Sequence, residues 1–458
     1  MQGYWGLSQR LLKNASLSLV SALHLTTATS GRISRVVSRF RMRSITNVVS
    51  YEEESIVSPL GSSLYTEARR SIIRLVELLI EDANVSRASD VHIDPTAHSL
   101  IVRMRIDGFL LPAHEFPLAI HPELIARIKI LAGLRIDEHN TPQDGRFKLL
   151  REPSAMIDLR VSITPTYYGE NAVLRIFGGT IEDFSLPSLS FSSQNQKKIA
   201  DALQHSHGMI LATGPTGSGK TTTMYTLVRM LTVPGISTIT LEDPIEYSMP
   251  GVRQIQINPK TGLTFASGLR SVLRQDPDVI MVGEIRDAES AALAIHAALT
   301  GHRLLSTLHT KDATSTITRL LDMGVEPYLV ASTISVSVGQ RLVRRICENC
   351  KSKCRVDDVQ MTVIQKMLNQ HETVERRKYF RGKGCALCKG TGYRGRMGVH
   401  EVMHITPRIR AAIHERRSSD EIKAIALSEG MVPIAHDALQ KAFEGFTTLE
   451  EALKTAYE

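Results

Sequence analysis

Apolar and polar positions alternate over much of residues 64–185, after an opening segment with helical periodicity. The helix is predicted where five apolar residues share one face. These are Ile72, Ile73, Val76, Leu79 and Ile80. Residues 89–94 and 100–108 then alternate with a period of two and predict a hairpin, and residues 157–163 predict another strand. Residues 64–185 are therefore expected to form a small α+β domain.

From about residue 190 the pattern changes to apolar runs that are followed at once by glycine or an acid and then by a helical segment. This order is typical of a parallel α/β sheet that carries its chemistry at the ends of its strands. We assign residues 186–342 to this domain. Residues 401–458 are expected to be helical, and Thr447 to Glu450 match a capping box at the start of the last helix.

A complete phosphate-binding motif lies between a predicted strand, residues 209–213, and a predicted helix. It has the form G-x-x-x-x-G-K-[ST]. Its residues, with the threonine that follows, are Gly214, Pro215, Thr216, Gly217, Ser218, Gly219, Lys220, Thr221 and Thr222. In such a loop backbone N–H groups turn towards the β-phosphate, the lysine neutralises the β and γ oxygens, and the threonine hydroxyl coordinates Mg²⁺. The motif predicts a site for ATP and Mg²⁺, with a glycine-rich surface turn as the alternative.

Acids follow two more predicted strands. Residues 279–284 place four apolar residues and a glycine before Glu284, a Walker B pattern in which the acid holds the Mg²⁺ ion or its water. Hydrolysis also needs a carboxylate that orients and deprotonates the attacking water. Residues 238–246 offer three candidates, Glu242, Asp243 and Glu246. A helix cap or a surface acid is the alternative for each of these acids taken singly.

Four of the five cysteines form two C-x-x-C pairs, Cys347 with Cys350 and Cys385 with Cys388. Paired knuckles of this kind offer four thiolates to a tetrahedral Zn²⁺ ion in a structural site, in a reducing compartment. An insertion with helical character, residues 356–377, lies between them. Cys354 is either a bystander or a replacement for Cys350. Residues 343–400 are accordingly predicted to be a tetracysteine zinc-binding subdomain.

The formal net charge of +8 is concentrated at the start of the chain. Residues 1–51 contain no acid and seven basic residues, which are Arg10, Lys13, Arg32, Arg35, Arg39, Arg41 and Arg43. Without them the charge of the remaining chain is +1. We therefore expect no basic groove for nucleic acid.

Residues 1–51 resemble a mitochondrial transit peptide, and residues 52–63 a linker. A lipid-binding basic tail and a secretory signal are the alternatives for the leader. No run of eighteen apolar residues is present, so no membrane-spanning helix is predicted.

Longer motifs then indicate a family. Residues 273–287 (LRQDPDVIMVGEIRD) resemble the signature of the ATPases of type II secretion, the E proteins, and of their type IV pilus relatives. Residues 241–247 resemble the Asp box of that family and residues 300–310 its His box. The similarity runs from about residue 64 to the end of the chain.

This resemblance implies an α/β fold with a RecA-like P-loop ATPase domain. The small α+β domain would precede it, and the tetracysteine zinc subdomain and C-terminal helices would follow. It makes Glu246 the general base, Glu284 the Walker B acid, and His309 and His302 sensors of the γ-phosphate. Without the resemblance, either histidine would be interpreted as a core or capping residue.

The transition state of phosphoryl transfer also favours an arginine supplied from another domain or subunit. Arg103 and Arg105 are two apart on a predicted strand and so share a face, and Arg160 lies on another strand. The resemblance places arginine fingers in this region, and Arg103 or Arg160 is the preferred candidate. A solvated strand face is the alternative.

Together these features predict a hexameric ATPase of a type II secretion system that acts on an inner-membrane platform protein and drives pseudopilus assembly. A type IV pilus extension ATPase is the alternative within the family. A DNA-translocating ATPase is disfavoured by the nearly neutral chain, and a non-catalytic scaffold by the presence of Lys220, Glu246 and Glu284. The leader suggests the mitochondrial matrix face of the inner membrane, and a bacterial cytoplasm is the alternative.

Overall fold

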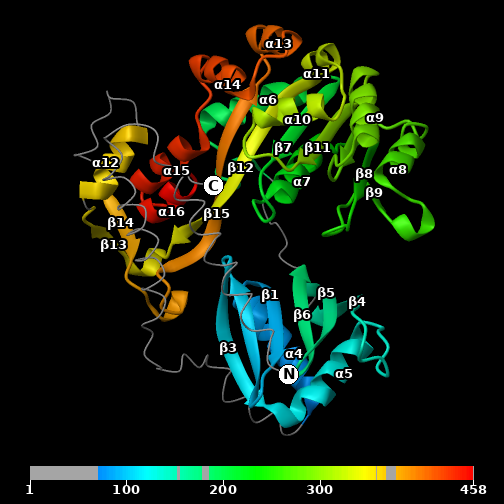
Figure 1. Cartoon of the computed structure of the whole chain (residues 1–458), viewed down its shortest axis with the longest axis vertical. Coiled ribbons are helices and arrows are strands. Elements are labelled where there is room, and N and C mark those ends of the chain that lie inside the picture. Colours follow the sequence, from blue (N-terminus) through cyan, green and yellow to red (C-terminus); the bar gives the residue numbers. More distant parts are fainter. Residues whose placement is uncertain (1–70, 152–154, 178–184, 357, 368–377, 457–458) are drawn as a thin grey trace, which may run out of the picture. The chain divides into compact units, whose positions relative to one another are not determined.

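Two β-sheets organise the computed structural model (Figure 1). The structure describes residues 71–151, 155–177, 185–356, 358–367 and 378–456. The predicted leader and linker, residues 1–51 and 52–63, lie outside the described residues.

The first sheet has six strands in the order β3-β2-β1-β6-β5-β4, and all neighbours are antiparallel. Its strands are β1 (Ala88–Pro95), β2 (Ser99–Ile106), β3 (Phe109–Pro117), β4 (Gln143–Arg151), β5 (Ala155–Thr166) and β6 (Gly169–Phe177). Two helices, α4 (Ile72–Val85) and α5 (His121–Leu131), pack against it, and a short 3₁₀ helix, Leu118–Ile120, leads into α5. The predicted helix, hairpin and strand are confirmed.

Period-two alternation separates the two faces of this sheet. Val91, Met104, Leu159 and Leu174 are buried on one face with the apolar side of α4. The intervening positions carry mostly polar and charged residues. The helix α4 begins where the hydroxyl of Ser71 accepts a hydrogen bond from the backbone N–H of Arg74.

The second sheet has seven strands in the order β15-β12-β7-β11-β10-β8-β9. The strands are β7 (Gly208–Thr213), β8 (Thr238–Glu242), β9 (Arg253–Gln256), β10 (Val279–Val282), β11 (Arg303–Leu308), β12 (Ile334–Ile346) and β15 (Tyr393–His404). All neighbours are parallel except β12 and β15. The predicted parallel α/β sheet is confirmed, and it has an antiparallel strand at one edge.

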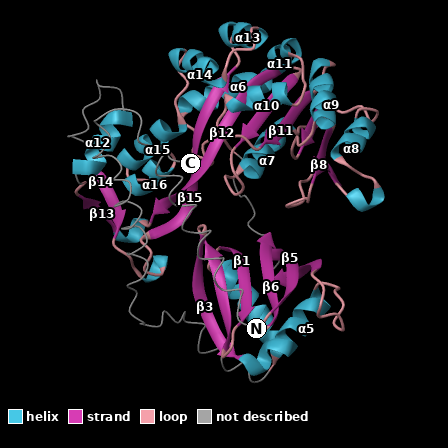
Figure 2. Ribbon diagram, in the orientation of Figure 1, coloured by secondary structure: helices cyan, strands magenta, loops and turns pink. Residues whose placement is uncertain are grey.

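Helices cover both faces of this sheet (Figure 2). They are α6 (Ser193–Gln204), α7 (Lys220–Leu231), α8 (Phe265–Val272), α9 (Ala288–Leu299), α10 (Ser315–Asp322) and α11 (Pro327–Thr333). Along β10, Ile280 and Val282 enter the core with α8 and α9, whereas Val279 and Met281 enter the core with α7. Burial on both faces explains why this strand is uniformly apolar.

Strands β12 and β15 are long and extend beyond the helix-covered part of the sheet (Figure 1). The cysteine-bearing segment leaves the end of β12 and returns at the start of β15. It contains β13 (Lys351–Cys354), α12 (Asp358–Met367), β14 (Tyr379–Gly382) and two 3₁₀ turns, Glu348–Cys350 and Ala386–Cys388. The proposed boundaries at residues 343 and 401 fall inside these two strands. The helical expectation for residues 401–404 is wrong, because they pair with β12.

Four helices complete the chain, and the last one begins one residue later than expected. They are α13 (Pro407–His414), α14 (Ser419–Ser428), α15 (Ile434–Phe443) and α16 (Leu449–Lys454). The hydroxyl that caps α16 belongs to Thr448 and accepts from the N–H of Glu451. Thr447 instead donates to the carbonyl of Arg344 at 2.7 Å. None of the described helices has the length and apolar character needed to cross a bilayer.

Glu451 fastens α16 to β12. Its carboxylate accepts hydrogen bonds from the backbone N–H of Arg344 at 3.1 Å, from the guanidinium of Arg344 at 2.8 Å and from Lys454 at 2.7 Å. Burial alone would raise the pKa of Glu451, but these hydrogen bonds and charges lower it to about 2. Its folded-state pKa is therefore below the value of about 4.3 expected in an unfolded chain.

We expect Glu451→Gln to lower the melting temperature by several degrees at pH 7. The difference should narrow as the pH falls below about 4.3 towards 2, because a carboxyl with a depressed pKa loses its stabilising effect there. Calorimetry at pH 7 and pH 3.5 measures this. Glu450→Gln, on the exposed side of the same helix, is the control. An equal difference in melting temperature between the variant and the unmodified chain at both pH values would contradict the prediction.

Candidate nucleotide site and metal centre

The predicted phosphate-binding loop lies at the carboxyl end of β7, near the middle of the seven-stranded sheet. The strand ends at Thr213 and α7 begins at Lys220, so the loop joins a buried strand to a helix N-terminus. The hydroxyl of Thr213 contacts the carbonyls of Leu308 and Thr310 at 3.1 and 3.0 Å. The end of β7 is thereby bonded to the end of β11.

Glycines are required in this loop because of both conformation and space. Gly214, Gly217 and Gly219 have φ values of 148°, 78° and 88°. A Cβ atom on Gly214 would lie 2.4 Å from the carbonyl oxygen of Gln340, and one on Gly219 would lie 2.8 Å from its side-chain nitrogen. The loop therefore lies directly against β12.

Polar groups of the loop are arranged to receive an anion. The N-terminus of α7 has Gly219 as its cap and no side-chain cap hydrogen bond. The buried Oγ of Ser218 has no hydrogen-bond partner among the described residues. The ammonium of Lys220 donates to the carbonyls of Gly214 and Pro215 at 2.7 and 3.1 Å, and its burial lowers its pKa. A helix N-terminus with a nearby ammonium fits the phosphates of a nucleotide.

Glu284 and His309 lie at the same edge of the sheet. Glu284 follows β10, and its carboxylate lies 3.5 Å from Nε2 of His309, which follows β11. Arg286 donates to the other carboxylate oxygen of Glu284, and this bond is the main cause that lowers the pKa of Glu284. Burial and the charge of Lys220 lower the pKa of His309. A partly buried carboxylate next to Lys220 fits a Mg²⁺ ion bound together with nucleotide phosphates.

The first acidic cluster leaves β8, the strand beside β10. Glu242 is the last residue of β8 and is 3% exposed, whereas Asp243 lies 3.8 Å from Arg286. Glu246 is half-buried, and its burial raises its pKa, as a general base requires. Of the three candidates, Glu246 therefore has the environment that best suits proton transfer.

His302 is not close to this group. It precedes β11, and its carbonyl accepts from the N–H of Gly208 at the start of β7. Its ring contacts the carbonyl of Ala297 at 2.9 Å, at the C-terminal end of α9. The length of β7 places His302 roughly 17 Å from the phosphate loop. Contact of His302 with a γ-phosphate is therefore not supported within this chain, and the capping interpretation holds.

The remaining loop threonines are accessible. Thr221 is exposed in the first turn of α7, Thr216 is exposed at the tip of the loop, and Thr222 is half-buried. The Thr221 side chain is thus accessible from outside the hydrophobic core, as a ligand for Mg²⁺ must be.

Arginines form a row across the antiparallel sheet. The register places Arg146 of β4 opposite Arg160 of β5, Arg160 opposite Arg175 of β6, and Arg175 opposite Asp90 of β1. Asp90 is in turn opposite Arg105 of β2. Residues directly opposite one another share a face, so these side chains all lie on the face that α4 and α5 leave uncovered.

The arginines on this face of the sheet differ in the hydrogen bonds and ion pairs that hold their side chains. The guanidinium of Arg103, on the same face, donates twice to Asp94 at 3.0 and 2.8 Å. Arg105 contacts Asp90 at 3.7 Å and donates to the carbonyl of Gly108. Arg160 is exposed and lies between Arg146 and Arg175 in the arginine row.

Arg146 and Arg175 were not among the arginines predicted for the site. Arg175 stands between Leu174 and Ile176 in the alternation of β6, and Arg146 lies on β4. Neither segment was predicted to be a strand. The period of two was therefore available as a signal for Arg175. The strand register that aligns Arg146 and Arg175 with Arg160 could not be read from the sequence.

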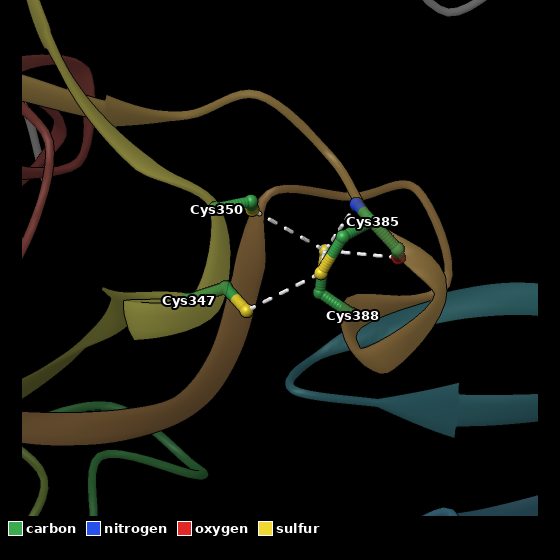
Figure 3. A group of neighbouring side chains, drawn as sticks. All are labelled: Cys347, Cys350, Cys385 and Cys388. Atoms are coloured by element: carbon green, nitrogen blue, oxygen red, sulfur yellow. Dashed lines mark hydrogen bonds between the residues drawn. The ribbon is translucent and has the colours of Figure 1, made fainter.

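The four paired cysteines converge (Figure 3). Their sulfur atoms all lie within 4.8 Å of one another. The Sγ–Sγ distance is 3.8 Å for Cys347 and Cys385 and also for Cys350 and Cys388. It is 3.6 Å for Cys385 and Cys388. A zinc ion with Zn–S bonds of about 2.3 Å gives tetrahedral edges of about 3.8 Å. The cluster therefore has the dimensions of a four-thiolate zinc site.

N–H groups surround two of these sulfurs. The backbone N–H groups of Cys385 and Gly392 donate to the sulfur of Cys388 at 3.1 and 3.2 Å. The side-chain amide of Asn349 donates to the sulfur of Cys385 at 3.3 Å. This hydrogen bond is the largest of several causes that lower the pKa of that thiol to about 6. Cys354 lies on β13 opposite Tyr379 and outside the cluster, so it does not replace Cys350.

Comparisons with known proteins agree with this geometry. The family model described as Type II/IV secretion system protein matches residues 66–454. The type IV pilus assembly ATPase PilB of Thermus thermophilus is 40% identical over 437 residues, 94% of this chain and 48% of that protein. The type II secretion system protein E of Pectobacterium carotovorum is 43% identical over 84% of this chain and 76% of its own length. The chain thus spans about half of the Thermus relative.

Two solved structures share the fold. The ATPase DotB of Legionella pneumophila matches with a TM-score of 0.61 at 22% identity, over 84% of this chain and 95% of its own. The pilus retraction motor PilT, solved with bound ADP, matches with a TM-score of 0.56 at 24% identity, over 83% of this chain and 96% of its own. At these identities the likeness concerns the fold.

We expect the purified chain to bind one Zn²⁺ ion through this cluster, because four thiolates at these spacings complete its coordination. Cys385→Ser should lose the metal and melt several degrees lower, and Cys354→Ser should keep both the metal and the melting temperature. Elemental analysis and thermal denaturation measure the two effects. Full metal content in Cys385→Ser would contradict the assignment.

Proposed function

Because the chain belongs to the Type II/IV secretion system protein family, we propose that it hydrolyses ATP to ADP and phosphate as the motor of a type II secretion system. The observation that carries the proposal is the meeting of Lys220, Glu284 and His309 at the edge of the sheet where the phosphate loop begins. A loop without these charged groups would bind a nucleotide without a means of hydrolysing it.

Each of these residues has a task in the proposed reaction. On nucleotide binding, Lys220 transfers its hydrogen bonds from the loop carbonyls to the β and γ phosphate oxygens. Thr221 and Glu284 would hold a Mg²⁺ ion, which would supply positive charge to those oxygens. Glu246 accepts the proton of the attacking water, and its raised pKa suits this role. His309, next to Glu284, contacts the γ-phosphate and responds to its loss.

Arginines from the antiparallel sheet complete the proposed site. We assign Arg160 the role of stabilising the transition state, because it is exposed and has an arginine on either side of it in the row. Arg103 is the weaker candidate, since its guanidinium is held by two hydrogen bonds to Asp94. Arg105 supports the row by its contact with Asp90. In a homohexamer these arginines can come from the same subunit or from a neighbour.

The machine that the motor serves is proposed from its relatives. Relatives named type II secretion system protein E support a role in secretion. The partner proposed for this role is a membrane platform protein that feeds the pseudopilus, as the family resemblance implies. A type IV pilus extension ATPase is the alternative, which the PilB relatives favour. Nucleic acid is not among the proposed partners, because residues 52–458 carry a net charge of only +1.

The cellular location is proposed from two kinds of observation. The relatives reported above from Thermus and Pectobacterium are bacterial, and they support the cytoplasmic face of a bacterial inner membrane. The acid-free composition of residues 1–51 instead favours the matrix face of a mitochondrial inner membrane. In both cases the protein would reach the membrane through its partners.

Substitution at Lys220 and Glu246 tests the proposed hydrolysis. We expect Glu246→Gln to bind ATP normally but to turn it over about 100-fold more slowly, since general base catalysis contributes at least that factor. Lys220→Ala should lose binding as well as turnover. Phosphate release and binding of a fluorescent ATP analogue measure the two properties. Glu415→Gln, an exposed acid on the C-terminal helices, is the control, and normal turnover in Glu246→Gln would contradict the assignment.

The location is testable with the leader alone. Residues 1–51 fused to a fluorescent protein should direct it to mitochondria in a eukaryotic cell, because the segment combines basic residues with the absence of acids. A fusion in which the seven basic residues are replaced by glutamine is the matched control. Diffuse cytosolic fluorescence of the unaltered fusion would favour the bacterial location.

A further inference from the structure

A buried carboxylate lies beside the nucleotide site and has no task in the reaction proposed above. Glu242, at the end of β8, is 3% exposed. Its carboxylate accepts hydrogen bonds from the hydroxyl of Thr240 at 2.6 Å, from the amide of Gln254 at 3.1 Å and from the hydroxyl of Tyr225. Three donors converge on one acid, as expected for an ionised carboxylate, which only accepts.

Tyr225 connects this acid to the proposed general base. It lies on α7, five residues after Lys220, and is fully buried. A phenol hydroxyl has one proton to donate and can also accept. Its proton goes to Glu242, and its oxygen accepts the backbone N–H of Glu246 at 3.3 Å. The hydroxyl therefore bridges the end of β8 and the segment that carries Glu246.

The segment that follows Glu246 is fixed at a further point. The amide nitrogen of Gln254, besides contacting Glu242, donates to the carbonyl of Tyr247 at 3.0 Å. Its amide oxygen accepts from the N–H of Met249 at 2.7 Å. The ring of Tyr247 packs edge-on against that of Tyr225, with 4.4 Å between centroids. Glu246 and the residues that follow it are thus held by Tyr225 and Gln254, which both contact Glu242.

We propose that Tyr225 and Glu242 are positioning residues for Glu246, and that the Tyr225 hydroxyl couples its placement to the phosphate-loop helix. Neither side chain touches the reacting atoms. Because Tyr225 and Lys220 share α7, a shift of that helix when phosphate binds moves the hydroxyl that holds Glu246. The inference rests on the proposed ATP hydrolysis.

Electrostatics give Glu242 a second effect on the base. Burial is the main cause that raises the pKa of Glu246, and the negative charge of Glu242 raises it further. Burial and the same charge also raise the pKa of Tyr225, so its hydroxyl keeps the proton that it donates. Removal of the charge on Glu242 should therefore lower the pKa of Glu246 without removing the side chain.

The first test is Tyr225→Phe in the full chain. This change removes the bridging hydroxyl and keeps the ring. We expect kcat for ATP to fall roughly tenfold, the size expected for loss of one hydrogen bond that orients a reacting group, while KM stays within about twofold. Tyr393→Phe is the matched control, because it removes a tyrosine hydroxyl that bonds to Thr448 at 2.9 Å in another part of the fold.

The second test is Glu242→Gln, which keeps the shape and an acceptor for Tyr225 but removes the charge. We expect the acidic limb of the pH profile of kcat/KM to move to lower pH, since the general base titrates at a lower pKa. A merely structural role for Glu242 would change the height of the profile and leave this limb in place. Melting temperatures of all variants identify any that fail to fold, and Glu242→Gln then tests the inference if Tyr225→Phe is unstable.

The outcomes separate this inference from its premise. Absence of ATP turnover in the unmodified chain would contradict the proposed function itself. Turnover in the unmodified chain together with a kcat of Tyr225→Phe within twofold of it would overturn the positioning role of Tyr225. An acidic limb that Glu242→Gln leaves unmoved would overturn the role of Glu242.

Discussion

The hydrogen-bonded pairing of β7 with both β11 and β12 is the constraint on which the remaining structure depends. It places the end of β7 in the middle of a parallel sheet, where the phosphate loop has acids and His309 on one side and β12 on the other. The loop lies so close to Gln340 of β12 that Gly214 and Gly219 leave no space for a side chain. The same strand β12 continues past the sheet, pairs with β15 and carries the cysteine cluster at its far end. A single strand thus connects the proposed nucleotide and metal sites.

Much of this arrangement follows from the sequence, because the local patterns that define it are short. The apolar runs before Gly214 and Glu284 predict buried parallel strands, and parallel strands bring their ends to one edge. Residue roles that depend on how distant strands pair were harder to predict from the sequence. His302 and His309 lie seven residues apart in the same motif. They flank β11, which places them at opposite ends of that strand. The motif alone does not distinguish them, whereas the direction of β11 does.

Register also explains what was missed in the antiparallel sheet and at the cysteines. The alternation of β5 gave the face of Arg160 but not its cross-strand neighbours, which are set by the register of β5 with β4 and with β6. Spacing likewise left Cys350 and Cys354 as alternative ligands. The pairing of β13 with β14 resolves this choice, because it places Cys354 opposite Tyr379, and Cys350, which precedes β13, faces the second knuckle.

The network around Glu242 shows why a buried charge is tolerated next to a catalytic centre. A carboxylate out of water is costly unless its lone pairs are satisfied, and here three donors from three different elements satisfy it. Each donor is thereby held in one orientation, since rotation would break its hydrogen bond to the buried charge. Tyr225 has one proton and gives it to Glu242, so its oxygen remains available to the N–H of Glu246. An apolar residue at position 242 would fill the same space but would not accept the hydrogen bond that orients the Tyr225 hydroxyl. This accounts physically for a charged residue at the end of a strand whose other residues are uncharged.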